Sequence, residues 1–161
     1  MDGATWKLAV VDGEYYTEND VGEKSITAVD GLTCTDCIIE TNLRFGDTEV
    51  GFFSGIVFRY TDNEHHYCFA IGAEHDWAEF IMFTPEHSHY GVSLALTYDV
   101  VIDQNTDYSL RVCIHENTFT GFLNGEEVLS ATDDTYTEGQ VGLRGQRSDA
   151  FFDNFTIYSL H

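Results

Sequence analysis

The chain has 161 residues, of which 43% are hydrophobic and 14% are aromatic, so it is long and apolar enough for one packed domain over 1–161 and is not a disordered chain. Its 28 acidic residues outnumber the 7 basic residues and give a net charge of −21. This charge excludes a surface for nucleic acid or anionic membrane, because few cations are present to neutralise phosphates. No apolar run approaches the roughly 20 residues of a membrane span.

Short segments with alternating apolar and polar residues follow one another along the chain, and each predicts a half-buried β-strand. Asn124-Gly125 is the strongest short hairpin signal, and residues 62–65 predict a turn. No helical periodicity of useful length occurs. The pattern predicts one all-β sandwich or barrel. In chain order, the predicted strands and hairpin are 37–45, 54–61, 66–72, 76–84, 107–116, 118–131, 139–145 and 150–160.

The same alternation predicts which side chains fill the core. In a two-sheet sandwich, one side of every strand faces the opposite sheet, and the other side faces outward. The residues assigned to the space between the sheets are Phe58, Phe69, Leu110, Val112, Leu123 and Phe155.

Seven segments, in this order, resemble the concanavalin A-like jelly rolls, most closely their laminin-G-like and carbohydrate-binding branches. The resemblance covers nearly the whole chain. It implies two curved antiparallel sheets, with ligand bound on the concave sheet or at the rim loops. It does not fix the function, because this sandwich carries lectins, glycanases and adhesion domains. The segments are W-x-L-x-V-V-D-G-x-Y (6–15), SGIVFRYTD (54–62), HYCFAI (66–71), YSLRV (108–112), FLNGEEV (122–128), GQVGLR (139–144) and FFDNFTI (151–157).

One acidic motif raises the possibility of catalysis. Glu18, Asp20 and Glu23 follow the Glu-x-Asp-x-x-Glu pattern of family-16 glycoside hydrolases, which share the jelly roll. In that family the motif lies on a strand of the concave sheet, where period-2 geometry points the acids into one cleft. Here the intervening Asn19 and Gly22 favour a turn. We therefore predict a solvated loop and no catalytic residues, with glycan hydrolysis as the least favoured alternative.

The resemblance also implies one structural Ca²⁺ between the N-terminal segment and the last strand. Asp153 matches the position of the ligating aspartate, and Asp12 and Asp30, each followed by glycine, are further candidate ligands. Ca²⁺ prefers six to eight oxygen ligands, including backbone carbonyls. The alternative is that Asp153 accepts backbone N–H bonds and caps a turn without an ion.

A ligand surface is predicted from aromatic and polar residues on the non-core sides of the strands. Aromatic rings stack on sugar C–H groups, and carboxylates and arginines bind hydroxyls. Trp77 is the predicted platform, although it could instead belong to the core. His87 and His89, two apart, could bind a transition metal from one strand face or could lie in a polar loop. The predicted ligand-binding set is Trp77, Tyr90, Arg59, Glu79, His66 and Arg111.

The four cysteines leave several alternatives open. Cys34-x-x-Cys37 has neither a second CxxC nor a helix start, so it supports neither a zinc knuckle nor a thioredoxin-like site. Cys68 and Cys113 could form a disulfide across neighbouring strands or remain buried thiols. An even number of cysteines suits an oxidising compartment.

Together these features predict a non-catalytic, calcium-stabilised module that binds an oligo- or polysaccharide outside the cell or at its surface. The alternative is a structural or adhesion domain that recognises another protein or self-associates through its sheet edges. The N-terminal Met-Asp-Gly-Ala-Thr-Trp is not a signal peptide. We therefore expect either a cytoplasmic protein or a module whose targeting segment lies outside this sequence.

Overall fold

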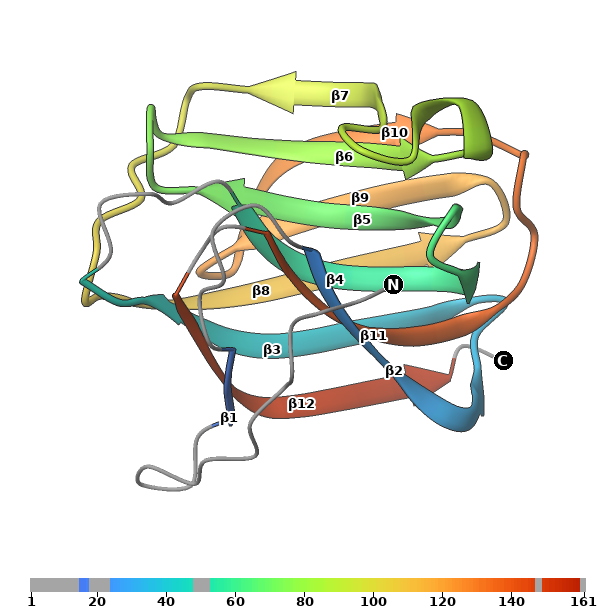
Figure 1. The fold of residues 1–161 in the computed structure, drawn as a ribbon, viewed down its shortest axis with the longest axis horizontal. Coiled ribbons are helices and arrows are strands. Elements are labelled where there is room, and N and C mark those ends of the chain that lie inside the picture. The colour runs from blue at the N-terminus through green and yellow to red at the C-terminus, as the bar shows by residue number, and fades with distance from the viewer. Residues whose placement is uncertain (1–14, 18–23, 48–52, 147–148, 160–161) are drawn as a thin grey trace.

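The computed structural model describes residues 15–17, 24–47, 53–146 and 149–159. These residues form two six-stranded antiparallel sheets packed face to face (Figure 1). The all-β sandwich predicted from the sequence is thereby confirmed, and the one helix in the described part is the 3₁₀ turn η1 (Pro85–His87).

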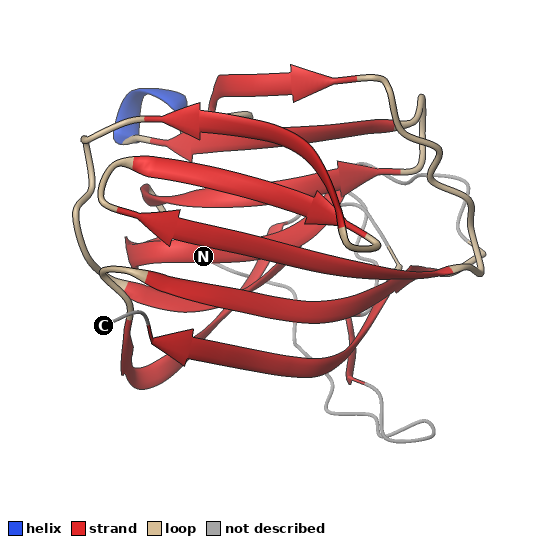
Figure 2. Ribbon diagram, turned by 180° about the vertical axis from the view of Figure 1, so that it is seen from behind, coloured by secondary structure: helices blue, strands red, loops and turns tan. Residues whose placement is uncertain are grey.

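Sheet I faces the viewer in Figure 2, and sheet II faces the viewer in Figure 1. The strands of sheet I, in spatial order, are β1 (Tyr15–Thr17), β12 (Ala150–Ser159), β3 (Cys37–Phe45), β8 (Asp107–His115), β9 (Thr118–Leu123) and β10 (Glu126–Thr132). Those of sheet II are β2 (Lys24–Thr33), β11 (Gln140–Gln146), β4 (Phe53–Asp62), β5 (His65–Gly72), β6 (Trp77–Phe83) and β7 (Val92–Thr97).

Three edge strands, β1, β2 and β7, do not appear among the predicted strands. β2 contains Asp30-Gly31, a pair that favours a turn, and Gly31 has φ +75°. The strand continues because its register with β11 shifts between Ala28 and Thr33, where Gly31 provides the backbone freedom for a bulge. Edge strands pair on one side only, so their sequences carry a weaker burial pattern than central strands.

Two tight connections follow directly from the sequence. Asn124 and Gly125 have φ values of +51° and +84°, and the flanking Leu123 and Glu126 face each other across β9 and β10. Positive φ at both central residues is the geometry that Asn-Gly favours in a two-residue hairpin. The predicted turn within 62–65 also forms, because β4 ends at Asp62 and β5 begins at His65.

The core lies between the two sheets, as predicted. Five of the six predicted core residues are buried there: Phe58, Phe69, Leu110, Val112 and Leu123. The sixth, Phe155, is only partly buried and packs against this core from β12.

The outward face of sheet II is also buried, which the sequence did not predict. Its cluster of Phe53, Val57, Cys68, Ala70, Ile81 and Phe83 has Ile26, Tyr60 and Trp77 packed against it. The buried guanidinium of Arg144 lies 3.8 Å from the ring centroid of Phe83 and 2.8 Å from His66 Nε2. This face is therefore an apolar layer that also encloses a polar network.

Candidate ligand site at the rim of the sandwich

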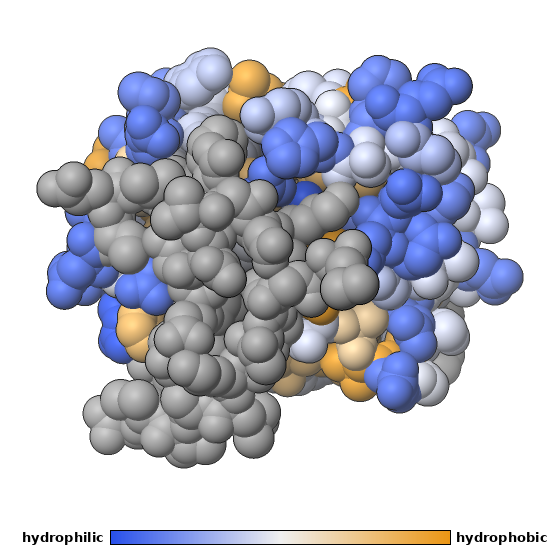
Figure 3. Space-filling model, in the orientation of Figure 1, coloured by the Kyte–Doolittle hydropathy of each residue, from blue (hydrophilic) through white to orange (hydrophobic). Residues whose placement is uncertain are grey.

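Three connections between strands meet at one end of the sandwich, on the right in Figure 1. They are the β2–β3 connection, the β8–β9 turn and the β10–β11 connection. They enclose a cavity of about 420 Å³, called the rim pocket here, and Figure 3 shows that the right-hand end is mostly hydrophilic on the face in view. The rim pocket is lined by Thr35, Asp36, Arg59, Glu116, Asn117, Asp134 and Thr137.

Arg59 reaches the rim pocket because β4 has a bulge at that position. Val57 pairs with Gly142, whereas Tyr60 pairs with Gln140, so β4 has one more residue than β11 between these two pairs. Arg59 has φ +48°. The backbone of Gly139 passes so close that an added Cβ would lie 2.4 Å from the carbonyl carbon of Arg59. The bulge redirects the arginine from the outward face of the sheet to its end.

The Arg59 guanidinium joins the three connections. Nη1 donates to the Tyr136 carbonyl over 2.9 Å, and Nη2 donates to the carbonyls of Thr35, at 3.0 Å, and of Glu116. Only 2% of Arg59 is exposed, and its guanidinium carbon lies 5.3 Å from the centroid of the Phe119 ring. Burial lowers the pKa of this guanidinium, and nearby Tyr67 and Asp36 counteract that effect.

One donor of this buried side chain is left over. Nε of Arg59 has no hydrogen-bond partner among the described groups. This Nε atom is itself buried, so the groups that a ligand can reach in the rim pocket are those around Arg59.

The remaining walls supply mainly hydrogen-bond acceptors. Asp36 Oδ1 accepts the backbone N–H of Glu116 over 2.8 Å, and its other oxygen lies 3.4 Å from His115 Nδ1. Asp134 and Asn117 are exposed at the mouth. Carboxylates accept hydrogen bonds from hydroxyl groups, and an amide both donates and accepts. The rim pocket is therefore suited to a ligand with several hydroxyls.

The structure does not bring the six predicted ligand residues onto one surface. Trp77, Glu79 and His66 lie on the outward face of sheet II, and Arg59 lines the rim pocket. Arg111 is on the outward face of sheet I, on the opposite side of the molecule. Tyr90 is exposed between η1 and β7. Period-2 alternation tells which side of its own strand a residue occupies, but not in which sheet the strand lies.

The residues on the face of sheet II are packed rather than open. Trp77 is partly buried, with its ring centroid 6.0 Å from that of Phe53. His66 is fully buried and stacks on Phe83 with centroids 4.6 Å apart. Burial raises the pKa of Glu79, and a hydrogen bond with Ser93 partly offsets this. The alternative in which Trp77 belongs to a hydrophobic cluster therefore fits the structure better than an open platform.

Arg111 is engaged on its own face of the molecule. Its Nη2 lies 2.6 Å from Glu40 Oε1, and its guanidinium carbon lies 5.8 Å from the Phe122 ring centroid. Surface pairs of this kind contribute little to stability. Arg111 is therefore an exposed arginine in a surface ion pair, whereas Arg59 is buried.

The described residues do not assemble the predicted calcium site. Asp153 lies on β12 of sheet I, Asp30 lies on β2 of sheet II, and Asp12 is outside the described residues. Asp153 Oδ1 accepts the backbone N–H of Asn154, which has φ +53°. This hydrogen bond lies at the irregularity of β12 between Asp153 and Thr156. No group of three or more His, Cys, Asp and Glu suited to a metal occurs within the described ranges.

Two further predicted features differ in the structure or fall outside it. His87 ends η1 and His89 follows it, so the two histidines do not share a strand face. The 3₁₀ turn forms because Pro85 follows Thr84, whose hydroxyl accepts the N–H of His87 over 3.2 Å. Glu18, Asp20 and Glu23 lie outside the described residues.

Of the two alternatives for Cys68 and Cys113, the structure has the free thiols, and it adds a disulfide that the sequence did not predict. Cys34 and Cys37 form a disulfide with Cα atoms 5.9 Å apart. Cys68 and Cys113 are free thiols, so a bond between them is excluded here. They lie on β5 of sheet II and β8 of sheet I, which are not neighbouring strands. Burial raises the pKa of Cys68 to about 12, so it is a poor nucleophile.

Of the residues that line the rim pocket, only Arg59 was predicted from the sequence to bind a ligand, and it was assigned to a sheet face. Asp36, Glu116, Asn117 and Asp134 lie in turns or connections, where an acid or amide is ordinary. The spacing of Cys34 and Cys37 could have indicated this part of the pocket wall, because a disulfide between the two cysteines restrains Thr35 and Asp36, which lie between them.

Comparison with known proteins supports the fold assignment. The levanase of Bacillus subtilis strain 168 is 27% identical over 123 residues, which are 76% of this chain and 18% of the levanase. The carbohydrate binding module CBM66 from Bacillus subtilis is 24% identical with a TM-score of 0.83, over 97% of this chain and 92% of that one. A Bacillus subtilis protein of unknown function with a galectin-like fold is 12% identical with a TM-score of 0.73, over 97% of this chain and 87% of that protein.

These likenesses confirm the concanavalin A-like jelly roll inferred from the seven sequence segments. The chain spans about a fifth of the length of the levanase. A sequence model of the 3-keto-alpha-glucoside-1,2-lyase-like domain matches residues 1–158. The chain belongs to this 3-keto-alpha-glucoside-1,2-lyase-like domain family.

Proposed function

We propose that this protein is a carbohydrate-binding module that holds a sugar in the rim pocket. The observation that carries the proposal is a cavity at one end of the sandwich that is lined by Asp36, Asn117 and Asp134 around the buried Arg59. Asp36 and Asp134 can accept hydrogen bonds from sugar hydroxyls, and the Asn117 amide can both donate and accept. The jelly-roll likeness to a carbohydrate binding module supports the same function.

The charge of the pocket defines the class of saccharide. Asp36, Glu116 and Asp134 contribute carboxylates, and the chain as a whole has a net charge of −21. Arg59 already donates to three carbonyls. A uronate or sulfated sugar would meet like charge without a free cation, so we propose a neutral saccharide. Levan is the first ligand to test, because one relative is a levanase.

The decisive experiment combines a glycan array that includes levan with titration calorimetry of purified variants. Asp134→Ala and Asn117→Ala change exposed residues of the rim pocket. We expect each to weaken binding by about tenfold, the effect of losing one or two hydrogen bonds in a site. Melting temperatures should change little, because exposed positions contribute little to stability.

Arg111→Ala and Tyr90→Ala are the matched controls. Both were predicted as ligand residues, and both lie away from the rim pocket. We expect wild-type affinity for both. If the controls lose binding and the pocket variants keep it, the ligand site is on an outer surface and the rim-pocket proposal is wrong.

Catalysis is tested in the same incubations. We propose a non-catalytic role, although the family is named for a lyase. Chromatography of the bound saccharides should show no shortened or rearranged product after prolonged incubation. A product that disappears in the Glu18→Gln variant would instead support the hydrolase alternative. A protein that binds no glycan and self-associates would favour the structural or adhesion role.

We also propose that the module works outside the cell or at its surface. The Cys34–Cys37 disulfide supports this, because disulfides persist in oxidising compartments. Measuring free thiols in protein isolated from its native source tests the idea. Two thiols per chain, from Cys68 and Cys113, are expected, whereas four would contradict it.

A stabilising Ca²⁺ at Asp153 stays a proposal. If the ion binds the native state, added calcium should raise the melting temperature and EDTA should lower it, by mass action. Asp153→Ala should abolish the response, and Asp30→Ala should reduce it if that residue is a ligand. An unchanged melting curve in EDTA would leave the hydrogen bond to Asn154 as the role of Asp153.

A further inference from the structure

The segment Cys34–Cys37 separates two cavities. On one side is the rim pocket, which includes Thr35 and Asp36 in its wall. On the other side is a groove of about 660 Å³ bounded by β2, β12 and the Cys34–Cys37 segment itself. The segment also carries the chain from the edge strand of sheet II to a central strand of sheet I. Its conformation therefore shapes the wall of the rim pocket.

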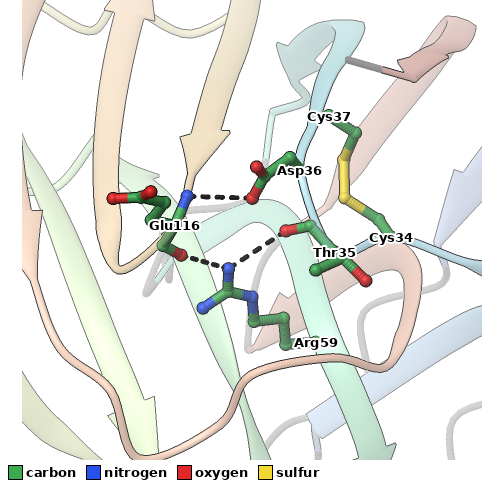
Figure 4. Close-up of a disulfide and its surroundings, with 6 residues drawn as sticks. All are labelled: Cys34, Thr35, Asp36, Cys37, Arg59 and Glu116. Carbon is green, nitrogen blue, oxygen red and sulfur yellow. Dashed lines mark hydrogen bonds between the residues drawn. A yellow bond between two sulfur atoms is a disulfide. The ribbon is translucent and has the colours of Figure 1, made fainter. Parts of the chain in front are cut away.

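Both residues between the cysteines are joined to the rim pocket by hydrogen bonds. Figure 4 shows the Thr35 carbonyl accepting from the Arg59 guanidinium, over 3.0 Å, and the Asp36 carboxylate accepting from the backbone of Glu116, over 2.8 Å. A shift of this segment would move two acceptors and release one donor of Arg59. The affinity of the pocket for its ligand thus depends on where the segment lies.

The ends of the segment are more deeply buried than its middle. Cys34 and Cys37 are 3% and 2% exposed, and the N–H of Cys34 donates to the Gly139 carbonyl over 2.9 Å. Thr35 is exposed, and Asp36 is partly exposed. The disulfide links the two buried ends and so limits the conformations open to the two residues between them.

We propose that the Cys34–Cys37 disulfide is a positioning element of the rim pocket, and that saccharide affinity depends on its redox state. The inference rests on the proposed function. With the bond formed, Thr35 and Asp36 are already ordered when the sugar arrives. With the bond broken, binding must order them, and fixing one freed residue lowers affinity by about tenfold.

The redox step needs a reductant, and a dithiol supplies it. One dithiol thiolate attacks a sulfur of the Cys34–Cys37 bond, and the resulting mixed disulfide is resolved by the second thiol. Two electrons and two protons pass to the protein, the S–S bond becomes two S–H groups, and the dithiol becomes a cyclic disulfide. The groove gives a route of approach, because both cysteines line it.

The test measures levan binding by calorimetry, well below the melting temperature, for oxidised wild type, dithiothreitol-reduced wild type and the Cys34→Ser/Cys37→Ser double variant. We expect about tenfold weaker binding for the last two. Reoxidation should restore affinity to the reduced wild type, and dithiothreitol should not affect the double variant. Cys113→Ser is the control, since that free thiol lies on β8 away from the pocket, and it should behave as wild type.

The outcomes separate this inference from the function on which it rests. Equal affinities with a lower melting temperature would mean that the disulfide only stabilises the fold, and would overturn the inference. If the double variant unfolds, the reduced wild type decides. A reversible loss of affinity with an unchanged circular dichroism spectrum then supports the inference. A loss of affinity that accompanies unfolding of the reduced protein overturns it. If oxidised wild type binds neither levan nor another neutral saccharide of the glycan array, or if Asp134→Ala binds as tightly as wild type, the proposed function itself has failed.

Discussion

Replacing Phe69 with alanine is expected to lower the free energy of unfolding by about 3–5 kcal/mol. Phe69 is fully buried on β5, and its ring centroid lies 5.0 Å from that of Phe80. Across the sandwich it faces Gly121, where an added Cβ would lie 2.5 Å from the ring. The glycine provides room for this ring, so truncation leaves a cavity between the two sheets. Chemical denaturation of both proteins measures the loss.

Phe122→Ala is the matched control, because Phe122 is the same residue type on the outward face of sheet I. It is partly exposed beside Arg111, and we expect a loss of about 1 kcal/mol or less. Similar losses at the two positions would contradict the assignment of the core to the space between the sheets.

Replacing Arg59 with methionine is expected to have the second large effect, on both stability and binding. Three backbone carbonyls would lose a hydrogen bond from a charged donor, and one such bond contributes about 1.5–3 kcal/mol. Water replaces part of this at the rim, so we expect a loss of about 3 kcal/mol in unfolding free energy. Saccharide affinity should fall by more than about tenfold, because the pocket wall loses the link between its three connections.

Two arginine variants make this prediction specific. Arg59→Lys keeps a positive charge but lacks the planar fork that reaches several acceptors, so it should restore little of the affinity. Arg111→Met removes an exposed ion pair and should change stability by no more than about 1 kcal/mol. If Arg59→Met and Arg111→Met proved equivalent in both denaturation and calorimetry, Arg59 would not be the centre of the site.

Much of the fold could be predicted from local patterns. The alternation in β5 and β8 identified Phe69, Leu110 and Val112 as inward-facing, and the structure buries all three. Asn124-Gly125 predicted a hairpin because few residues adopt positive φ at two successive positions. In each case the decisive interaction is between residues close in sequence, or depends only on which side of a strand a side chain occupies.

The candidate site could not be predicted in this way. Arg59 follows the alternation of β4 in the sequence, yet a bulge turns it toward the end of the sheet. Arg59 donates to three backbone carbonyls, and these are separated from it in the sequence by 24, 57 and 77 positions. Likewise, the alternation placed Arg111 and His66 on one ligand surface, but their strands lie in different sheets.

The sequence by itself therefore determined the central strands, the hairpin turns and the inward-facing side chains, since these depend on backbone preference and on the two-residue period of a β-strand. The tertiary structure alone decided which strands share a sheet, where β4 bulges, and which connections meet around Arg59. Those features result from hydrogen bonds and packing between distant segments. No local pattern encodes them, because each partner is an ordinary turn residue until the fold brings it to the rim.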